Sequence, residues 1–110
     1  MDCVFCRIAA GEIPATIVAR TENAVAFRDL NPQAPTHVLV IPIRHSGSAS
    51  DADATTMGAI MRLAADVAAK LGIAEQGYRL VVNTGAHGGQ SVDHLHVHLL
   101  GGRQMEWPPG

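Results

Sequence analysis

Three of the six histidines of this 110-residue chain alternate with apolar residues near its C-terminal end, at His94, His96 and His98. Strict alternation predicts a β-strand over residues 94–100, in which successive side chains point to opposite faces. The leucine and valine residues of this stretch then pack into a core on one face. The other face presents three imidazoles spaced roughly 6–7 Å apart. Because imidazole serves as an acid or base, a nucleophile and a metal ligand, we expect this face to carry the function.

Two cysteines near the N-terminus, Cys3 and Cys6, form a Cys-x-x-Cys pair. This spacing suits a metal ion, but it is a weak signal by itself, because a closed site needs two further ligands. The alternative is a pair of buried thiols that behave as small apolar groups.

The segment before the histidines, residues 84–91, is expected to be a turn because it contains Gly85, Gly88 and Gly89. A hairpin that needs positive φ explains these glycines as well as backbone N–H groups that bind a phosphate. Since a short glycine turn joins antiparallel neighbours, the strand expected over residues 78–83 should pair with the histidine strand.

The elements that position these residues follow from periodicity and from breakers. Apolar side chains at steps of three and four predict an amphipathic helix from Met57 to Leu71, which begins in the N-cap-rich residues 51–55 and ends at Gly72. A short helix is expected before Gly11. The order of elements predicts an α+β fold with a mostly antiparallel sheet. The expected strands span residues 16–19, 24–27, 37–41, 78–83 and 94–100.

Composition places the chain in the globular class, with 47% hydrophobic and 16% charged residues. Its length suits a single domain over residues 1–110. The net charge of −2 offers no basic surface for nucleic acid, so no such partner is expected. No apolar run approaches the roughly 20 residues of a membrane span, and the start Met1-Asp2-Cys3 shows no signal peptide. A cytoplasmic location with reduced cysteines is therefore expected.

The stretch 94–100 matches the histidine-triad pattern: His, apolar, His, apolar, His, apolar, apolar. Nearly the whole chain resembles the Hint branch of the histidine-triad (HIT) family. This resemblance implies a HIT-like fold, a homodimer and a nucleotide hydrolase that acts at the α-phosphate. The Hint branch implies a purine nucleoside phosphoramidase, which cleaves a P–N bond to release AMP and an amine. The further segments that carry the resemblance are residues 11–14, Asp29, 32–37, 40–42, Asn83, 88–92 and 101–110.

The resemblance implies a set of catalytic residues. His96 corresponds to the nucleophile, with one ring nitrogen held by the backbone carbonyl of His94. His98 and Ser91 are expected to hydrogen-bond the phosphate oxygens, where negative charge develops. His37 is expected to support the triad from behind. The alternatives are that His96 is one of several metal ligands and that His37 is a satisfied core histidine.

The resemblance also implies contacts to the nucleotide. Asp29 is expected to accept ribose hydroxyls, and Phe27 and Leu30 to flank the base while also packing in the core. Asn83 is expected beside the nucleotide, although a strand-ending turn residue explains it as well. The backbone N–H groups of the glycine turn are expected at the phosphate. The full implied set is Phe27, Asp29, Leu30, Asn83, Gly89, Gln90, Ser91, His96 and His98.

Zinc-bearing members of the family supply the two ligands that the cysteine pair lacks. They use the histidine of an Ile-Pro-x-x-His segment and the first triad histidine, here His45 and His94. With Cys3 and Cys6 these form a Cys₂His₂ set that implies a closed, structural zinc. Such a site would attach the N-terminal helix to the sheet.

Two positions depart from the usual Hint pattern. Asp93 stands before the triad where tyrosine is common, and Glu106 stands in the tail where histidine is more usual. Both add negative charge near an anion site, which is expected to weaken nucleotide affinity or favour basic leaving groups. His87 is interpreted as a surface loop residue.

Four functions remain open at this stage. The first is phosphoramidate hydrolysis through a nucleotidyl-His96 intermediate, and the second is a dinucleoside polyphosphate hydrolase of the Fhit kind. The Trp-Pro-Pro-Gly ending at residues 107–110 favours the first of these. The third is a nucleotide-binding interaction protein, in which hydrolysis is incidental. The fourth is a metallohydrolase that holds a catalytic zinc with all three histidines.

Overall fold

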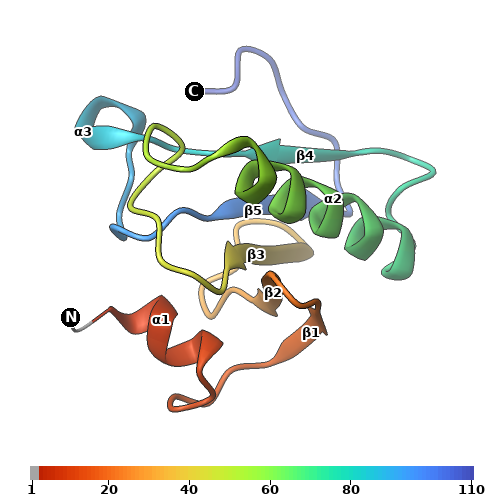
Figure 1. Cartoon of the computed structure of the whole chain (residues 1–110). Coiled ribbons are helices and arrows are strands. Elements are labelled where there is room, and N and C mark those ends of the chain that lie inside the picture. The colour runs from red at the N-terminus through yellow and green to blue at the C-terminus, as the bar shows by residue number, and fades with distance from the viewer. Residues whose placement is uncertain (1–2) are drawn as a thin grey trace.

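The computed structural model describes residues 3–110, so Met1 and Asp2, which begin the segment considered above for a signal peptide, lie outside the described residues. Its strands form one sheet with helices on its faces, as expected for an α+β fold (Figure 1). In chain order the elements are α1 (Val4–Ala9), β1 (Ile17–Arg20), β2 (Ala24–Arg28), β3 (Thr36–Pro42), α2 (Ala54–Lys70), β4 (Tyr78–Val81), α3 (Gly85–Gly88) and β5 (Val97–Gly101).

The sheet has the strand order β1-β2-β3-β5-β4, and every neighbouring pair is antiparallel. The predicted pairing of β4 with the histidine strand is confirmed, with Val81 opposite His98. On its other side His98 lies opposite Leu39 of β3. The third triad histidine therefore sits in the interior of the sheet, between two neighbouring strands.

Helix α2 covers one face of the sheet (Figure 1). It begins where predicted, because the Asp53 carboxylate accepts the N–H of Thr56 at 2.8 Å and caps the first turn. Its apolar stripe packs on alternate residues of the strands, as the predicted amphipathic helix requires. The strand and strand-flanking residues on this face are Ala24, Ala26, Val38, Val40, Leu95, Val97 and Leu99.

Helix α1 packs on the opposite face, through Phe5 and Ala9. The intervening strand residues face it, as the two-residue period of a strand requires. Imidazoles lie on this same face, since His96 makes an edge contact with Phe5 at a ring-centroid distance of 5.3 Å. The strand residues of this second cluster are Val25, Phe27, Leu39 and Ile41.

Two predicted boundaries need correction. The histidine strand begins at Val97 and not at residue 94, because its partner β3 ends at Pro42, which has no N–H for the ladder. Leu95 donates its N–H to Ser46 instead, at 2.7 Å. The glycine turn over residues 84–91 contains the short helix α3, which ends at Gly89 with a φ of 78°.

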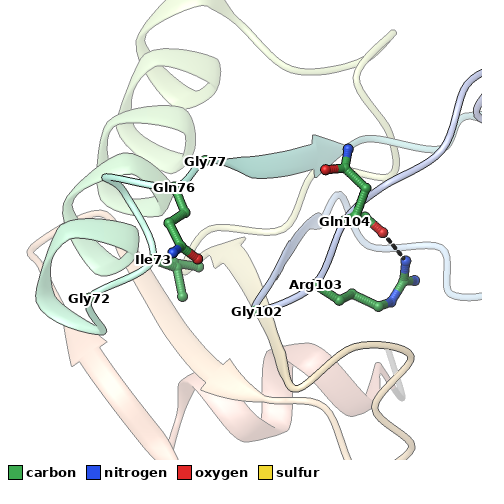
Figure 2. Close-up of a pocket in the computed structure, with 7 residues that line it drawn as sticks. All are labelled: Gly72, Ile73, Gln76, Gly77, Gly102, Arg103 and Gln104. Carbon is green, nitrogen blue, oxygen red and sulfur yellow. Dashed lines mark hydrogen bonds between the residues drawn. The ribbon is translucent and has the colours of Figure 1, made fainter.

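The tail after β5 runs beside β4 (Figure 1), where Arg79 donates to the Glu106 carbonyl at 2.8 Å. At the C-terminal end of α2 lies a hollow of about 440 Å³ (Figure 2). Arg103 lines it and donates to the carbonyls of Gln104 and Gln33. Its lining contains no histidine, cysteine or carboxylate. Within residues 3–110, no helix is both long and apolar enough to span a membrane.

Candidate functional site

A hydrogen bond determines which ring nitrogen of His96 carries the proton. Its Nδ1–H donates to the His94 carbonyl at 2.8 Å, as the resemblance implied. A neutral imidazole carries one N–H, so Nε2 keeps a free lone pair. His96 is only 3% exposed. Every buried side-chain nitrogen and oxygen in the described chain has a hydrogen-bond partner, and His96 Nε2 has none. Nε2 is therefore not buried and reaches the surface. An imidazole of this form, held by the backbone and packed against Phe5, is arranged for nucleophilic attack.

A chain of hydrogen bonds also sets the tautomers of His37 and His98. The backbone N–H of Gln33 donates to His37 Nδ1 at 3.0 Å, so His37 carries its proton on Nε2. That N–H donates to His98 Nδ1 at 2.9 Å. His98 in turn carries its proton on Nε2, where it is a hydrogen-bond donor. The rings of His96 and His98 are neighbours, with their centroids 4.9 Å apart.

Burial lowers the pKa values of two of these imidazoles, those of His98 and His37, and so keeps these two neutral. It lowers the pKa of His98 to about 4, and the neighbouring His96 and His37 act in the same direction. Burial also lowers the pKa of His37, against the opposing effect of the Asp29 carboxylate. At neutral pH the assigned tautomers are therefore the populated states of these two side chains.

Asp29 lies at the end of β2, beside this chain of imidazoles. One carboxylate oxygen accepts the N–H of Asn31 at 2.8 Å, and the other is 3.5 Å from His37 Nε2. Phe27 of β2 is buried in the core beside α1, where the sequence predicts that it packs. The expectation that Leu30 packs in the core is wrong, since its side chain is 97% exposed in the loop after β2. Exposure leaves Leu30 available to a ligand.

The segment around α3, between β4 and β5, holds the remaining predicted site residues. Ser91 is exposed, and Asn83 is half-buried at the end of β4. The N–H groups of Gly89 and Gln90 donate to the carbonyls of Ala86 and Gly85, at 3.1 Å each. These two donors are engaged inside the loop. The N–H and hydroxyl of Ser91 therefore remain as the candidate phosphate donors of this segment.

The four predicted metal ligands meet at one point between α1 and the sheet. His94 Nδ1 lies 3.3 Å from Cys3 Sγ, 3.5 Å from Cys6 Sγ and 3.2 Å from His45 Nδ1. His45 Nδ1 lies 3.3 Å from Cys6 Sγ. Ligands at the usual Zn–N and Zn–S lengths of a tetrahedron are separated by roughly 3.3–3.6 Å. The cluster is positioned to bind a metal.

The tautomer of His94 also supports metal binding by this cluster. The Nε2–H of His94 donates to the Pro42 carbonyl at 2.9 Å, which leaves the lone pair of Nδ1 directed at the two sulfurs. A second group of possible ligands, formed by Asp29, His37 and His98, differs in this respect. There the Gln33 N–H holds a proton on His37 Nε2, the nitrogen that would have to bind the metal. We assign metal binding to the first group only.

These contacts place His94 and His96 in different roles. His94 is fully buried and its Nδ1 belongs to the cluster with the cysteines, while His96 is not part of that cluster and binds the His94 carbonyl through Nδ1. The three histidines thus do not converge on one metal ion, which argues against the metallohydrolase hypothesis. A hollow of about 660 Å³, lined in part by His45, Ser91 and Asp93, lies between the metal cluster and the α3 loop.

Sequence reasoning missed three groups that set the site. They are the backbone N–H of Gln33, the Pro42 carbonyl and the Phe5 ring, which contact His37, His94 and His96. The first two are backbone groups, whose partners no residue type reveals. Phe5 belongs to α1, which the sequence predicts only as a short helix before Gly11.

Comparison with known proteins supports one family. The sequence pattern described as HIT domain matches residues 10–105. The chain is 49% identical to a 14 kDa zinc-binding protein of Zea mays, covering 97% of this chain and 87% of that protein. It is 46% identical to the purine nucleoside phosphoramidase of Escherichia coli, covering 94% and 90%.

A solved structure agrees with these relatives. The fold matches the crystal structure of a HIT family hydrolase from Legionella pneumophila with a TM-score of 0.95 and 51% identity, covering 99% of this chain and 100% of that one. The matched fold contains the five-stranded antiparallel sheet, whose strand β5 holds His98, and the long helix α2. From its triad, its fold and these matches, the chain belongs to the HIT domain family.

Proposed function

We propose that this protein is a nucleotide hydrolase that cleaves the P–N bond of purine nucleoside phosphoramidates through a nucleotidyl-His96 intermediate. The observation that carries the proposal is the 2.8 Å hydrogen bond from His96 Nδ1 to the His94 carbonyl, which leaves Nε2 as a nucleophile. The phosphoramidase relative in Escherichia coli and the HIT family hydrolase structure support the reaction class.

The reaction takes two displacements. In the first, the His96 Nε2 lone pair attacks the α-phosphorus, the P–N bond breaks, and the leaving nitrogen takes up a proton from solvent to depart as the amine. In the second, water attacks the same phosphorus and returns a proton to solvent, the bond to His96 breaks, and AMP is released. The Nε2–H of His98 and the Ser91 hydroxyl hydrogen-bond the phosphoryl oxygens, where charge grows in each transition state. Asp29 accepts the ribose hydroxyls, and Phe27 and Leu30 flank the base.

We further propose one structural zinc per chain, held by Cys3, Cys6, His45 and His94. The zinc-binding relative in Zea mays and the tetrahedral spacing of the four ligand atoms support this metal. When bound, it supplies folding free energy by connecting α1, the loop after β3 and the segment before β5. Because four protein ligands complete a tetrahedron, a zinc ion held there would have no open position for water.

The decisive experiment determines whether the configuration at the α-phosphorus is retained during hydrolysis. A nucleoside phosphoramidate that is chiral at phosphorus should be hydrolysed with retention of configuration, because two inversions restore the original hand. Because a P–N bond to imidazole is labile in acid and stable in base, trapping at alkaline pH should place the nucleotidyl group on His96. The variant His96→Ala should bind AMP while losing nearly all turnover, because it deletes the nucleophile and leaves the ribose and base contacts in place.

Inversion at phosphorus, or substantial turnover by His96→Ala, would contradict the covalent mechanism. The same assay with dinucleoside polyphosphates tests the competing hydrolase specificity. A protein that binds AMP and turns over neither substrate class is instead a nucleotide-binding interaction protein.

A further inference from the structure

We infer that Gln90 is a positioning residue that holds Ser91 at the reacting phosphoryl group. The inference rests on the proposed function, in which Ser91 contacts the phosphate oxygens. Its basis is the set of contacts made by the Gln90 side chain, which touches neither the triad nor the place of the substrate. Gln90 would act through Ser91.

The side-chain amide of Gln90 has three partners. Its Oε1 accepts the N–H of Gly85 at 3.0 Å. Its Nε2 donates one proton to the Gly47 carbonyl at 2.7 Å and the other to the Val92 carbonyl at 3.0 Å. All donors of the amide are thereby used, and their partners fix which atom is nitrogen and which is oxygen.

The bond to Val92 spans Ser91 and closes a small ring around it. On the preceding side, the backbone N–H of Gln90 donates to the Gly85 carbonyl at 3.1 Å. The backbone of Ser91 is thus held on both sides by hydrogen bonds of Gln90. Ser91 itself is exposed, so packing contributes little to its position. Its placement depends mainly on Gln90.

The bond to Gly47 connects this loop to another part of the chain. Gly47 follows His45 and Ser46 in the loop after β3. The Ser46 carbonyl accepts the N–H of Leu95, which stands between two triad histidines. The loop after β3 is therefore attached to the triad segment through Leu95 and to the α3 loop through Gln90. Gln90 makes one of these attachments and thereby sets Ser91 relative to the histidines.

The substitution Gln90→Glu separates the accepting role of the side chain from its two donating roles. In Gln90→Glu the carboxylate still accepts from Gly85, but it has no proton for the carbonyls of Gly47 and Val92. It also places negative charge against those two carbonyls. In Gln90→Ala all three side-chain bonds are lost without a new charge. Gln76→Glu is the matched control, since Gln76 lines the hollow at the end of α2 (Figure 2).

The test is a double-mutant cycle on phosphoramidate hydrolysis. Ser91→Ala should lower kcat by ~100-fold, as expected for one donor to a transition-state oxyanion. Gln90→Glu should lower kcat by roughly tenfold, the size of one hydrogen bond, with little change in KM. The variant that combines both changes should be no slower than Ser91→Ala alone, because Gln90 acts through Ser91. Gln76→Glu should match the wild type.

Three outcomes overturn the inference: Gln90→Glu leaves kcat unchanged, its effect multiplies with that of Ser91→Ala, or it raises KM alone. Thermal melting shows whether each variant folds, and Gln90→Ala replaces Gln90→Glu where the charge prevents folding. If neither variant folds, Gln90 is a general structural residue and the inference is wrong. An active wild type with an inactive His96→Ala keeps the proposed function in every one of these cases.

Discussion

Neighbours from separate parts of the chain determine which ring nitrogen of His96, His98 and His37 carries the proton. The His94 carbonyl fixes the proton of His96, and the Gln33 N–H fixes that of His37 and, through it, of His98. One imidazole therefore offers a lone pair while its neighbour offers an N–H. Three identical side chains acquire different chemistry from their hydrogen-bond partners.

The role of Asp29 is tested by conservative substitution. We expect Asp29→Asn to weaken nucleotide binding by about 1.5–3 kcal/mol, because a charged hydrogen bond to the ribose is lost, with a smaller effect on kcat. Calorimetric titration with AMP and with its 2′,3′-dideoxy analogue measures this. Equal affinity of the wild type for both nucleotides would show that Asp29 does not contact the ribose.

The lowered pKa of His98 predicts that acid destabilises the fold. Because its pKa falls from about 6.5 in the unfolded chain to about 4, the unfolded chain binds more protons between these values. The free energy of unfolding is therefore at its full value above pH 6.5 and decreases as the pH falls toward 4. Urea unfolding at a series of pH values should show a shallower decrease for His98→Asn than for the wild type.

The exposed His87 supplies the control for this experiment. His87→Asn should retain the pH dependence of the wild type. A His98→Asn variant with an unchanged slope would contradict the assignment of the proton uptake to His98.

At the scale of elements, the site depends on where strands stop. β3 ends at Pro42, and the freed carbonyl of this residue orients His94 toward the cysteines. α1 begins at Cys3, whose sulfur accepts the N–H of Cys6 at 3.4 Å and caps the helix. The metal cluster thus forms at the ends of elements and connects them.

Removal of a metal ligand should destabilise the protein more than it weakens nucleotide binding. We expect Cys6→Ala to lose the zinc and to lower Tm by roughly 10 °C or more, the effect of about 2 kcal/mol in a chain of this size. Elemental analysis, thermal melting and AMP titration measure the three quantities. A chelator should lower Tm of the wild type and leave that of the variant unchanged. Absence of zinc from wild type purified without chelators would refute the site.

Packing between β5 and the segment after α2 restricts Gly101. A Cβ there would lie 2.5 Å from Cδ1 and 3.2 Å from Cβ of Ile73. We expect Gly101→Ala to lower the free energy of unfolding by about 1–3 kcal/mol, measured in urea. Gly58→Ala, at an exposed position of α2 with open space around it, should instead add about 0.5–1 kcal/mol. Equal stability of the two variants would contradict the packing argument.

At the scale of the molecule, α2 and α1 cover opposite faces of the sheet, and the imidazoles lie on the face of α1. β1 and β4 form the two edges of the sheet. Trp107, in the tail beside β4, is 83% exposed. Edge strands and exposed aromatic side chains are features that a partner chain covers.

We therefore expect a homodimer in which the tail, residues 101–110, reaches toward the nucleotide site of the partner. Light scattering at micromolar concentration should give twice the chain mass of 11.6 kDa. Trp107→Ala should weaken the dimer. A monomer with full activity would contradict this arrangement.

Alternation and periodicity determined much of the fold. The apolar positions of residues 94–100 and of α2 predict the core, because local spacing alone decides which side chains share a face. The family pattern added the residues that meet at the site, including His45 and His94 beside the cysteine pair. These features depend on residue type and spacing, which a sequence displays directly.

The tertiary structure decided the remainder. It assigned the protons of His96, His98 and His37, placed Leu30 in solvent, started β5 at Val97 and engaged the N–H groups of Gly89 and Gln90 within their loop. Apart from the exposure of Leu30, each of these facts depends on backbone carbonyls and N–H groups, which are chemically alike in every residue. Only the folded chain determines which of them meet, and the protons of the three imidazoles follow from those meetings.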